Sequence, residues 1–251
     1  MTGASGFIGG HLVEALLASG ARVIALTRPS SRLAESLRDR VECIDWTLAG
    51  LDAALGPRHV DCLYHLAAYG VRPADIDVEI MLRVNVGMAT ELVRLCERRN
   101  AGLLIAGSNS EYRQPVIYNT VTEQSPLEIG KLYGSSKAAG SILASTLANE
   151  VGVRLRVLLL FNVYGPGEPS HRLLVNLTMG LKANRRVALT AGTQVRDFVY
   201  ITDVVEAFIA AAARISQESS PTTAIWNVCT GHRTYCPCVC FDDGSQSWCG
   251  F

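Results

Sequence analysis

The sequence predicts an α/β fold in which a doubly wound parallel sheet carries helices on both faces. Short apolar and β-branched segments alternate with helical segments along most of the 251 residues, an order typical of parallel sheets. A glycine-rich turn near the N-terminus opens the first helix. Apolar residues make up 49% of the chain, which is enough to bury a sizeable core.

Hydrophobic periodicity places the elements in order along the chain. Between the first turn and about residue 165, strands and helices alternate regularly, and beyond that point the alternation loosens. Helices are predicted over residues 9–19, 76–99, 133–151, 172–183 and 202–214; strands over 22–26, 41–45, 62–66, 103–106 and 154–161; and short extended pieces over 187–190 and 225–228.

Charge and hydropathy exclude several classes of partner. The formal net charge is zero and Lys and Arg form no long runs, so neither nucleic acid nor an acidic membrane surface is expected as a partner. No apolar run is long enough to span a bilayer. The glycine-rich turn begins almost at the first residue and leaves no room for a signal peptide, so we expect a cytoplasmic protein.

Three glycines near the N-terminus have the spacing of a phosphate-binding turn. Gly3 and Gly6 allow a tight turn and close approach of the backbone to a pyrophosphate, and Gly9 lets the helix pack near the sheet. The start of that helix, with Phe7 and Ile8, offers unpaired N–H groups to the anion. Glycine-rich turns are common, but the helix and strand that follow at once favour a dinucleotide site on a Rossmann-type sheet.

A Rossmann-type sheet has a central strand directly before this turn, and the sequence starts at the turn. Without that strand, both of its neighbours are expected to expose apolar edges. We interpret the sequence as starting downstream of its true beginning; the alternative is that another segment fills the gap.

The residues after the 22–26 strand favour NADP over NAD. No carboxylate is present there to bind a ribose 2′-hydroxyl, whereas Arg28 and Arg32, with two serines between them, suit a 2′-phosphate. The competing interpretation is a solvated loop with ordinary surface arginines. After the next strand, Asp45 and Trp46 are candidates to lie near the adenine, although a lone Asp after a strand is more often a turn former.

Tyr133 and Lys137 are the candidate catalytic pair. Their spacing sets the phenol and the ammonium on one face of a helix, where the positive charge is expected to lower the tyrosine pKa and the lysine to reach ribose hydroxyls. A tyrosine so tuned exchanges a proton with a carbinol or carbonyl oxygen, and Ser108, at the end of the preceding strand, can hydrogen-bond the same oxygen. Taken alone, this spacing usually indicates only a solvent-exposed helix face.

Together these motifs resemble the extended short-chain dehydrogenases of the NAD(P)-dependent epimerase/dehydratase type. The resemblance covers roughly residues 2–233 and is specific for the family but much less so for the reaction. The matching segments, in order, are the phosphate turn, His65-Leu66-Ala67-Ala68, Asn85-Val86-Gly87, Gly107-Ser108, Tyr133-x-x-x-Lys137, Phe161-Asn162-Val163-Tyr164-Gly165-Pro166-Gly167 and Arg196-Asp197-Phe198-Val199-Tyr200.

The resemblance implies further site residues and a nucleotide-activated sugar as substrate. Arginine is suited to bind the diphosphate of such a substrate, because the forked guanidinium group matches the spacing of phosphate oxygens. The residues expected to line the cofactor path are Leu66, Ala67, Ala68 and Val163, and Asn85 is expected to bind the cofactor and support the active site. Those expected to bind the substrate are Glu111, Asn162, Arg172 and Arg196.

The segment after Ser108 bears on the reaction. Dehydratases of this type usually carry an acidic residue in the pair directly after the catalytic Ser or Thr, whereas here Asn109-Ser110 follows and the only carboxylate, Glu111, comes one place later. This arrangement resembles that of 4-keto-6-deoxy sugar nucleotide reductases. We expect NADPH-dependent reduction of such a substrate; the alternatives are a sugar-nucleotide 4-epimerase and a catalytically silent NADP-binding regulator.

The last residues change character. Five of the eight cysteines lie between Cys229 and Cys249, but their spacing does not match a zinc site, so no metal is expected and a shifted reading frame or aberrant end is favoured. Cys43, Cys62 and Cys96 are expected to be reduced core residues. We predict a dinucleotide-binding domain over residues 1–165, a smaller, incomplete substrate lobe over 166–233 with interleaved sheet elements, and an atypical tail over 234–251, with a homodimer as the candidate assembly.

Overall fold

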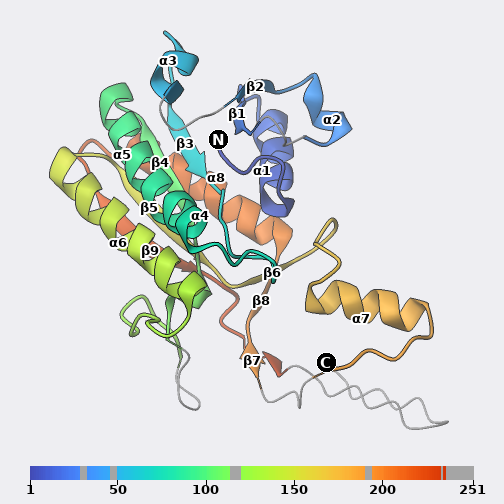
Figure 1. Ribbon diagram of the computed structural model, residues 1–251. Helices are drawn as coiled ribbons and strands as arrows, with labels where there is room; N and C mark the ends of the chain where they lie inside the picture. The colour runs from blue at the N-terminus through green and yellow to red at the C-terminus, as the bar shows by residue number, and fades with distance from the viewer. Residues whose placement is uncertain (29–32, 46–49, 114–119, 190–193, 233, 236–251) are drawn as a thin grey trace.

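The computed structural model describes residues 1–28, 33–45, 50–113, 120–189, 194–232 and 234–235, and it confirms the α/β fold with a doubly wound parallel sheet (Figure 1). Four strands lie side by side in the order β3, β4, β5, β9, all parallel. Their bounds are Cys62–His65, Gly102–Ser108, Leu155–Leu160 and Thr223–Val228. A separate parallel pair is formed by β1 (Ile24–Thr27) and β2 (Glu42–Asp45).

Within the described residues, Met1 and Thr2 join the pair β1–β2 to the rest of the sheet. Thr2 forms parallel bridges to both Leu26 of β1 and His65 of β3. The Leu26 amide donates to the Met1 carbonyl at 2.7 Å, and the Thr2 amide donates to the Tyr64 carbonyl at 2.9 Å. Met1 and Thr2 therefore occupy the central strand position at its carboxyl end, so the predicted gap is bridged there.

At the amino ends of β1 and β3 the two strands flank a cavity of about 180 Å³. Its lining combines apolar side chains with Arg22, His59, Asp61 and the Met1 amino terminus, whose pKa burial lowers to about 5. The cavity is lined by Met1, Leu16, Ala21–Ile24, Leu26, Leu55 and residues 59–64.

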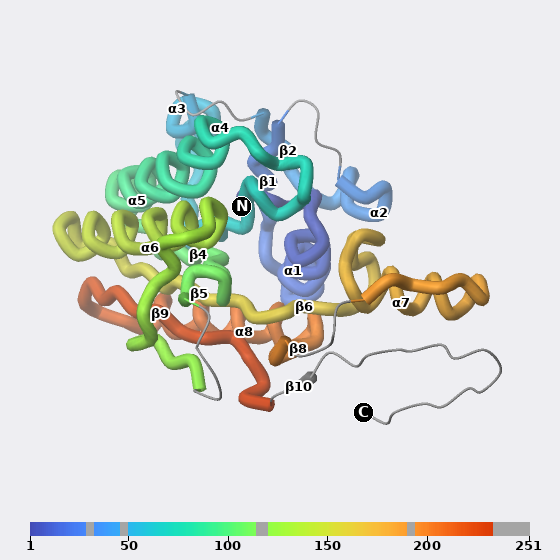
Figure 2. Tube along the Cα trace, turned by 60° about the horizontal axis from the view of Figure 1, so that its bottom comes forward, coloured from blue at the N-terminus to red at the C-terminus, as the bar shows by residue number. Residues whose placement is uncertain are grey.

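Helices cover both faces of the sheet and enclose two cores (Figures 1 and 2). On one face α1 (Phe7–Ala18) and α8 (Ile201–Gln217) pack together, and Leu12 and Phe208 are fully buried between helix and sheet. On the other face α5 (Met88–Arg99) packs against α6 (Leu132–Val151), with Leu92 and Ala144 fully buried. The helix predicted over 76–99 is in fact α4 (Val78–Leu82), a π-helical turn (Arg83–Gly87) and α5.

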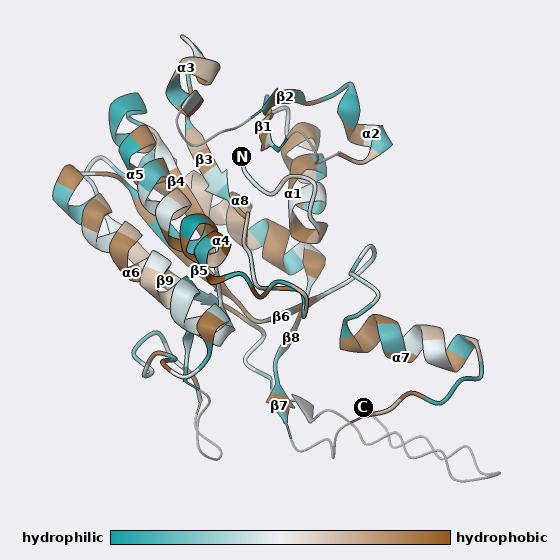
Figure 3. Cartoon of the chain, viewed as in Figure 1, coloured by the Kyte–Doolittle hydropathy of each residue, from teal (hydrophilic) through white to brown (hydrophobic). Residues whose placement is uncertain are grey.

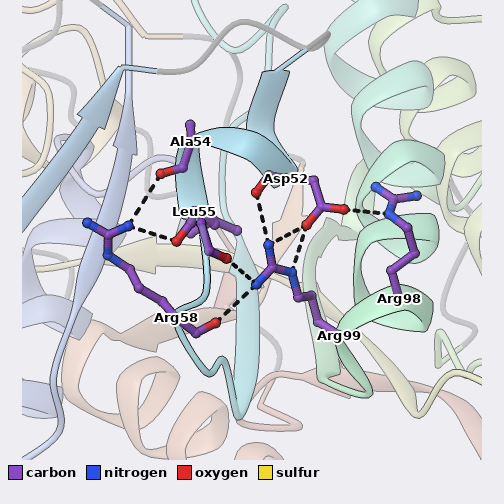
Figure 4. Close-up of polar contacts among 7 residues, drawn as sticks. Asp52, Ala54, Leu55, Arg58, Arg98 and Arg99 are labelled. Atoms are coloured by element: carbon purple, nitrogen blue, oxygen red, sulfur yellow. Dashed lines mark hydrogen bonds and ion pairs between the residues drawn. The ribbon is translucent and has the colours of Figure 1, made fainter.

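Short elements complete the fold. Arg98 and Arg99, at the end of α5, bind Asp52 of α3 (Leu51–Leu55), and Arg99 also donates to the carbonyls of Gly56 and Arg58 (Figure 4). These contacts fix α3 beside α5. The remaining elements are α2 (Glu35–Arg38), the 3₁₀ turn Asn109–Glu111, α7 (Leu173–Lys182), the parallel pair β6 (Asn162–Tyr164) and β8 (Phe198–Tyr200), and the antiparallel pair β7 (Val195–Arg196) and β10 (Thr234–Tyr235).

Hydropathy follows this architecture, with apolar residues gathered along the strands and on the inner sides of the helices (Figure 3). Helix α7 extends to one side of the sheet domain, and it leaves Met179 58% exposed. No helix in the described part of the chain is long and apolar enough to cross a membrane. The chain re-enters the sheet domain after α7: β9 pairs with β5, and α8 packs on one face of the sheet.

Two sequence-based expectations were wrong in detail. Residues 187–189 form no strand, and residue 190 lies outside the described part of the chain. Cys43 is exposed rather than buried, because it lies on β2 at the edge of the sheet, whereas Cys96 lies on the buried side of α5. Trp46, Arg32 and residues 236–251 of the cysteine-rich tail also lie outside the described residues.

Candidate active site

The phosphate turn lies at the carboxyl end of the sheet, and close packing dictates its glycines. Gly3 has φ +72°, and a Cβ there would lie 2.7 Å from backbone atoms of Leu66 and Ala67. A Cβ at Gly9 would lie 2.0 Å from the Gly3 carbonyl oxygen, so only glycine lets α1 begin this close to the turn. Gly6 caps α1 without a side-chain hydrogen bond. The first N–H groups of α1, beginning at Phe7 and Ile8, are thus left for an anion.

Thr2 and His65 fasten the turn to the loop after β3. The Thr2 hydroxyl lies 2.7 Å from Nδ1 of His65 and accepts a hydrogen bond from the Ala67 amide at 3.2 Å. Burial and the charge of Lys137 lower the pKa of His65 to about 3, so the ring that shares this hydrogen bond with Thr2 is neutral. Leu66 and Ala67 are half-buried and Ala68 is exposed along this loop, as a cofactor-lining segment requires.

Arg28 and Asp45 lie at neighbouring strand ends. Asp45 pairs in register with Thr27, the last residue of β1, and Arg28 follows directly. Both side chains are exposed, which leaves them accessible to a ligand at the carboxyl edge of the sheet. Their roles toward the adenosine half of a cofactor stay predictions.

The structure brings Tyr133, Ser108 and Lys137 together. Tyr133 is on the first turn of α6, and a Cβ at Gly70, in the loop after β3, would touch its ring at 2.9 Å. The Ser108 side chain hydrogen-bonds the Tyr133 hydroxyl. Lys137, one turn further along α6, is buried, and its ammonium donates to the Ala106 carbonyl of β4 at 2.7 Å.

The expected lowering of the tyrosine pKa by Lys137 was wrong for the structure as it stands. Burial raises the pKa of Tyr133, and the charge of Glu111 raises it further, whereas the Ser108 hydrogen bond and the charge of Arg172 lower it. Lys137 is not among these causes, and its ammonium donates to the Ala106 carbonyl. Burial also lowers the pKa of Lys137 itself, against the opposing charge of Glu111.

Asn85 organises the region behind the pair. It lies in the π-helical turn, only 2% exposed. Its amide nitrogen donates to the Tyr69 carbonyl and to the Ser136 hydroxyl, both at 2.9 Å, and its amide oxygen accepts from the Tyr69 N–H at 2.9 Å. Asn85 therefore ties the loop after β3 to α6, which agrees with a supporting role.

The candidate substrate-binding residues form a second group beyond β5. Asn162 donates from its side chain and its backbone to the Asp197 carbonyl, at 3.1 and 3.0 Å. The Asp197 carboxylate in turn accepts from Thr230 and Gly231, so it fixes the loop after β9, a contact that residue spacing did not reveal.

Arg172 and Arg196 are half-buried, and Arg172 faces both Tyr133 and the Glu168 carboxylate, 3.8 Å from its Nε. Glu168 also escaped the sequence analysis, which offered no partner for it. Val163 is buried in the core opposite Val199, so its side chain supports the site rather than lining it. Glu111 is only 2% exposed and bonds the Ser108 backbone, a placement that does not suit direct contact with substrate.

The comparison with known proteins agrees with this geometry. The family model of the NAD dependent epimerase/dehydratase family matches residues 1–229, and the chain belongs to that family. Its members include sugar-nucleotide epimerases, dehydratases and 4-dehydrogenases, so the chain is placed among NAD-dependent enzymes that modify sugar nucleotides. The resemblance based on the sequence motifs is thereby confirmed.

Individual relatives cover most of the chain. The UDP-glucose 4-epimerase of Mycolicibacterium smegmatis is 32% identical over 231 residues, which are 84% of this chain and 72% of that protein. The dTDP-6-deoxy-L-talose 4-dehydrogenase (NAD(P)(+)) of Kitasatospora kifunensis is 31% identical over 240 residues, 91% of this chain and 72% of that protein. Among solved structures, MoeE5 in complex with UDP-glucuronic acid and NAD has a TM-score of 0.79 and 29% identity, covering 94% of this chain and 77% of that one.

Proposed function

We propose that this protein is an oxidoreductase that transfers hydride at C4 of a nucleotide-activated sugar, most plainly as a reductase of a 4-keto-6-deoxy sugar nucleotide. The observation that carries the proposal is the assembly of Tyr133, Ser108 and Lys137 at the carboxyl end of β4, beside a phosphate turn. Two relatives above 30% identity, one a 4-epimerase and one a 4-dehydrogenase, support chemistry at this carbon.

The residues present fit a nicotinamide dinucleotide. A Cβ at Gly3 or Gly9 would overlap backbone at 2.7 or 2.0 Å, so these glycines preserve a tight turn beneath the uncapped start of α1, the cradle that a pyrophosphate needs. The phosphate turn, Leu66 and Ala67 would hold the dinucleotide, and the nicotinamide would supply or accept the hydride. MoeE5 was solved with NAD, which supports the same class of cofactor here.

The chain's own groups handle the proton. The Tyr133 hydroxyl gives a proton to the developing alkoxide on C4, and the Ser108 hydroxyl orients the same oxygen. Asn162 and Arg196 would position the substrate diphosphate, and the charge of Arg172 acts on Tyr133. Dehydration is disfavoured because it needs a free acid–base pair, while the nearest carboxylate, Glu111, is buried and bonded to the Ser108 N–H at 2.9 Å.

A 4-epimerase is the second candidate, favoured by the M. smegmatis relative. The test incubates the full chain with a dTDP-4-keto-6-deoxy sugar and NADPH, and separately with UDP-glucose and NAD. Oxidation of NADPH in stoichiometric amounts supports the reductase, whereas conversion of UDP-glucose to UDP-galactose without net change in cofactor supports the epimerase. Cofactor binding without either reaction would contradict both and leave a silent NADP-binding regulator.

We further propose NADP rather than NAD as the preferred cofactor, on the basis of the exposed Arg28 after β1. Arg28→Ala should weaken NADPH binding by roughly 1.5–3 kcal/mol, the value of a lost charge-assisted bond, and leave NADH binding unchanged. Arg94→Ala, on the exposed side of α5, is the matched control. Equal losses for both cofactors in a titration would show that Arg28 only shapes its loop.

A further inference from the structure

The catalytic corner is the carboxyl end of β4 with Ser108, together with Tyr133 and Lys137 of α6. Glu111 is a buried carboxylate within this corner. It ends the 3₁₀ turn Asn109–Glu111 that follows β4, and its side chain is only 2% exposed. Its Oε1 accepts a hydrogen bond from the Ser108 N–H at 2.9 Å, while the Ser108 hydroxyl accepts from the Ser110 N–H at 3.1 Å. These reciprocal bonds form a capping box, so the carboxylate holds the turn that presents Ser108.

The packing around this carboxylate is tight at Gly107. A Cβ on Gly107 would lie 2.9 Å from Glu111 Oε1 and 2.3 Å from a methyl carbon of Leu159. Any larger residue at position 107 would displace the carboxylate or the strand. Gly107, Ser108 and Glu111 therefore act as one unit at the end of β4.

The charged and titratable groups that face Glu111 come from α6 and from its own segment. Lys137 of α6 is buried and donates to the Ala106 carbonyl. Its positive charge lowers the pKa of Glu111, and the negative charge of Glu111 raises the pKa of Lys137. Tyr133 of α6 and Tyr112, the next residue along the chain, are the phenols whose pKa values its charge raises. Burial lowers the pKa of Lys137, and the charge of Glu111 offsets part of that effect.

We propose that Glu111 is a positioning residue for the reaction: it fixes Ser108 against the Tyr133 hydroxyl and balances the buried charge of Lys137. The expected effect on kcat rests on the proposed function, whereas the effect on the structure and on the Tyr133 titration does not. This positioning role takes the place of the direct substrate contact that the sequence analysis expected of Glu111. Because the amide of Gln retains an oxygen acceptor, Glu111→Gln separates the charge of the side chain from its hydrogen bond to Ser108.

The kinetic test compares Glu111→Gln and Glu111→Val with the wild type and with Glu128→Gln. Glu128 is another buried carboxylate near the start of α6, bonded to the Gly130 N–H at 2.7 Å, so it controls for loss of a buried charge. We expect Glu111→Gln to lower kcat by about tenfold to hundredfold, with KM nearly unchanged. This loss is smaller than the rate enhancement that a general acid usually contributes. Glu111→Val should lose more, because Ser108 is also released, and Glu128→Gln should keep the wild-type kcat.

A titration that needs no substrate completes the test. The phenolate absorbance of Tyr133, isolated by subtracting the Tyr133→Phe variants, should titrate at lower pH in Glu111→Gln than in the wild type and should not move in Glu128→Gln. A shifted titration without turnover of any sugar nucleotide would uphold the role of Glu111 in charge balance and overturn the proposed function. Normal turnover with unmoved kcat and titration in Glu111→Gln would overturn the inference, as would losses that only follow a lowered Tm.

Discussion

The two ends of the same sheet are built very differently. At the catalytic corner, β4 is paired along its length with β5, and β5 with β9, and the strand end carries Ser108 toward α6. At the junction of β1 and β3, backbone pairing comes from Met1 and Thr2, and a cavity of about 180 Å³ continues between the strands. The comparison teaches that the chemistry and the cohesion of this fold depend on separate regions, so they can be perturbed separately.

The largest expected effect is confined to the catalytic corner. Tyr133→Phe removes the proton donor and should lower turnover by about 10²–10⁴-fold, while cofactor affinity and Tm stay near those of the wild type. Tyr112→Phe is the matched variant, because its hydroxyl donates to Asn227 at 2.8 Å and its loss should cost about 1 kcal/mol of stability instead. Steady-state kinetics and thermal melts of both variants provide the measurement. Full turnover by Tyr133→Phe would show that Tyr133 is not the proton donor.

A second prediction probes the turn that joins the two regions. Gly9→Ala places a methyl group 2.0 Å from the Gly3 carbonyl oxygen, so it should lower stability by about 1–3 kcal/mol and cofactor affinity at least tenfold. Gly10→Ala meets no atom within 4 Å on the same helix and should stabilise by up to about 1 kcal/mol. Calorimetric titration with NAD(P) and urea unfolding distinguish the pair. Similar behaviour of the two variants would contradict the close packing at Gly9.

The catalytic corner was the easier region to predict from sequence. Regular alternation of strand and helix located β4, β5 and α6, and the spacing of Tyr133 and Lys137 placed both on one helix. The spacing could not show that Lys137 binds the Ala106 carbonyl or that Glu111 turns inward, since both depend on how the end of β4 packs against α6. Pairing across the β1–β3 junction was likewise missed, because two residues carry no periodicity.

A third prediction addresses the junction alone. Four apolar β-branched residues placed before Met1 should enter the cavity between β1 and β3, replace the buried terminal amine with an amide and raise stability by about 1–3 kcal/mol, or several degrees in Tm. Four Gly and Ser residues in the same position are the control for length. Turnover should be the same in both proteins. Equal Tm values for the two extensions would show that the cavity does not accept a strand.

The smallest effect concerns His65, which lies on β3 and bonds Thr2 across the junction at 2.7 Å. Its pKa is about 3 in the folded protein, because burial and Lys137 oppose protonation, and about 6.5 when unfolded. The unfolded chain therefore binds the proton more readily, so His65 contributes stability above pH 6.5 that is lost as the pH falls toward 3. Between pH 6.5 and 5.5 the free energy of unfolding should fall by about 1 kcal/mol, measured by urea denaturation. His65→Gln should lose this contribution and keep that of the buried Met1 amine, whose pKa burial lowers to about 5, whereas His59→Gln, at an exposed position, should keep both. An unchanged slope in His65→Gln would assign the acid sensitivity to groups other than His65.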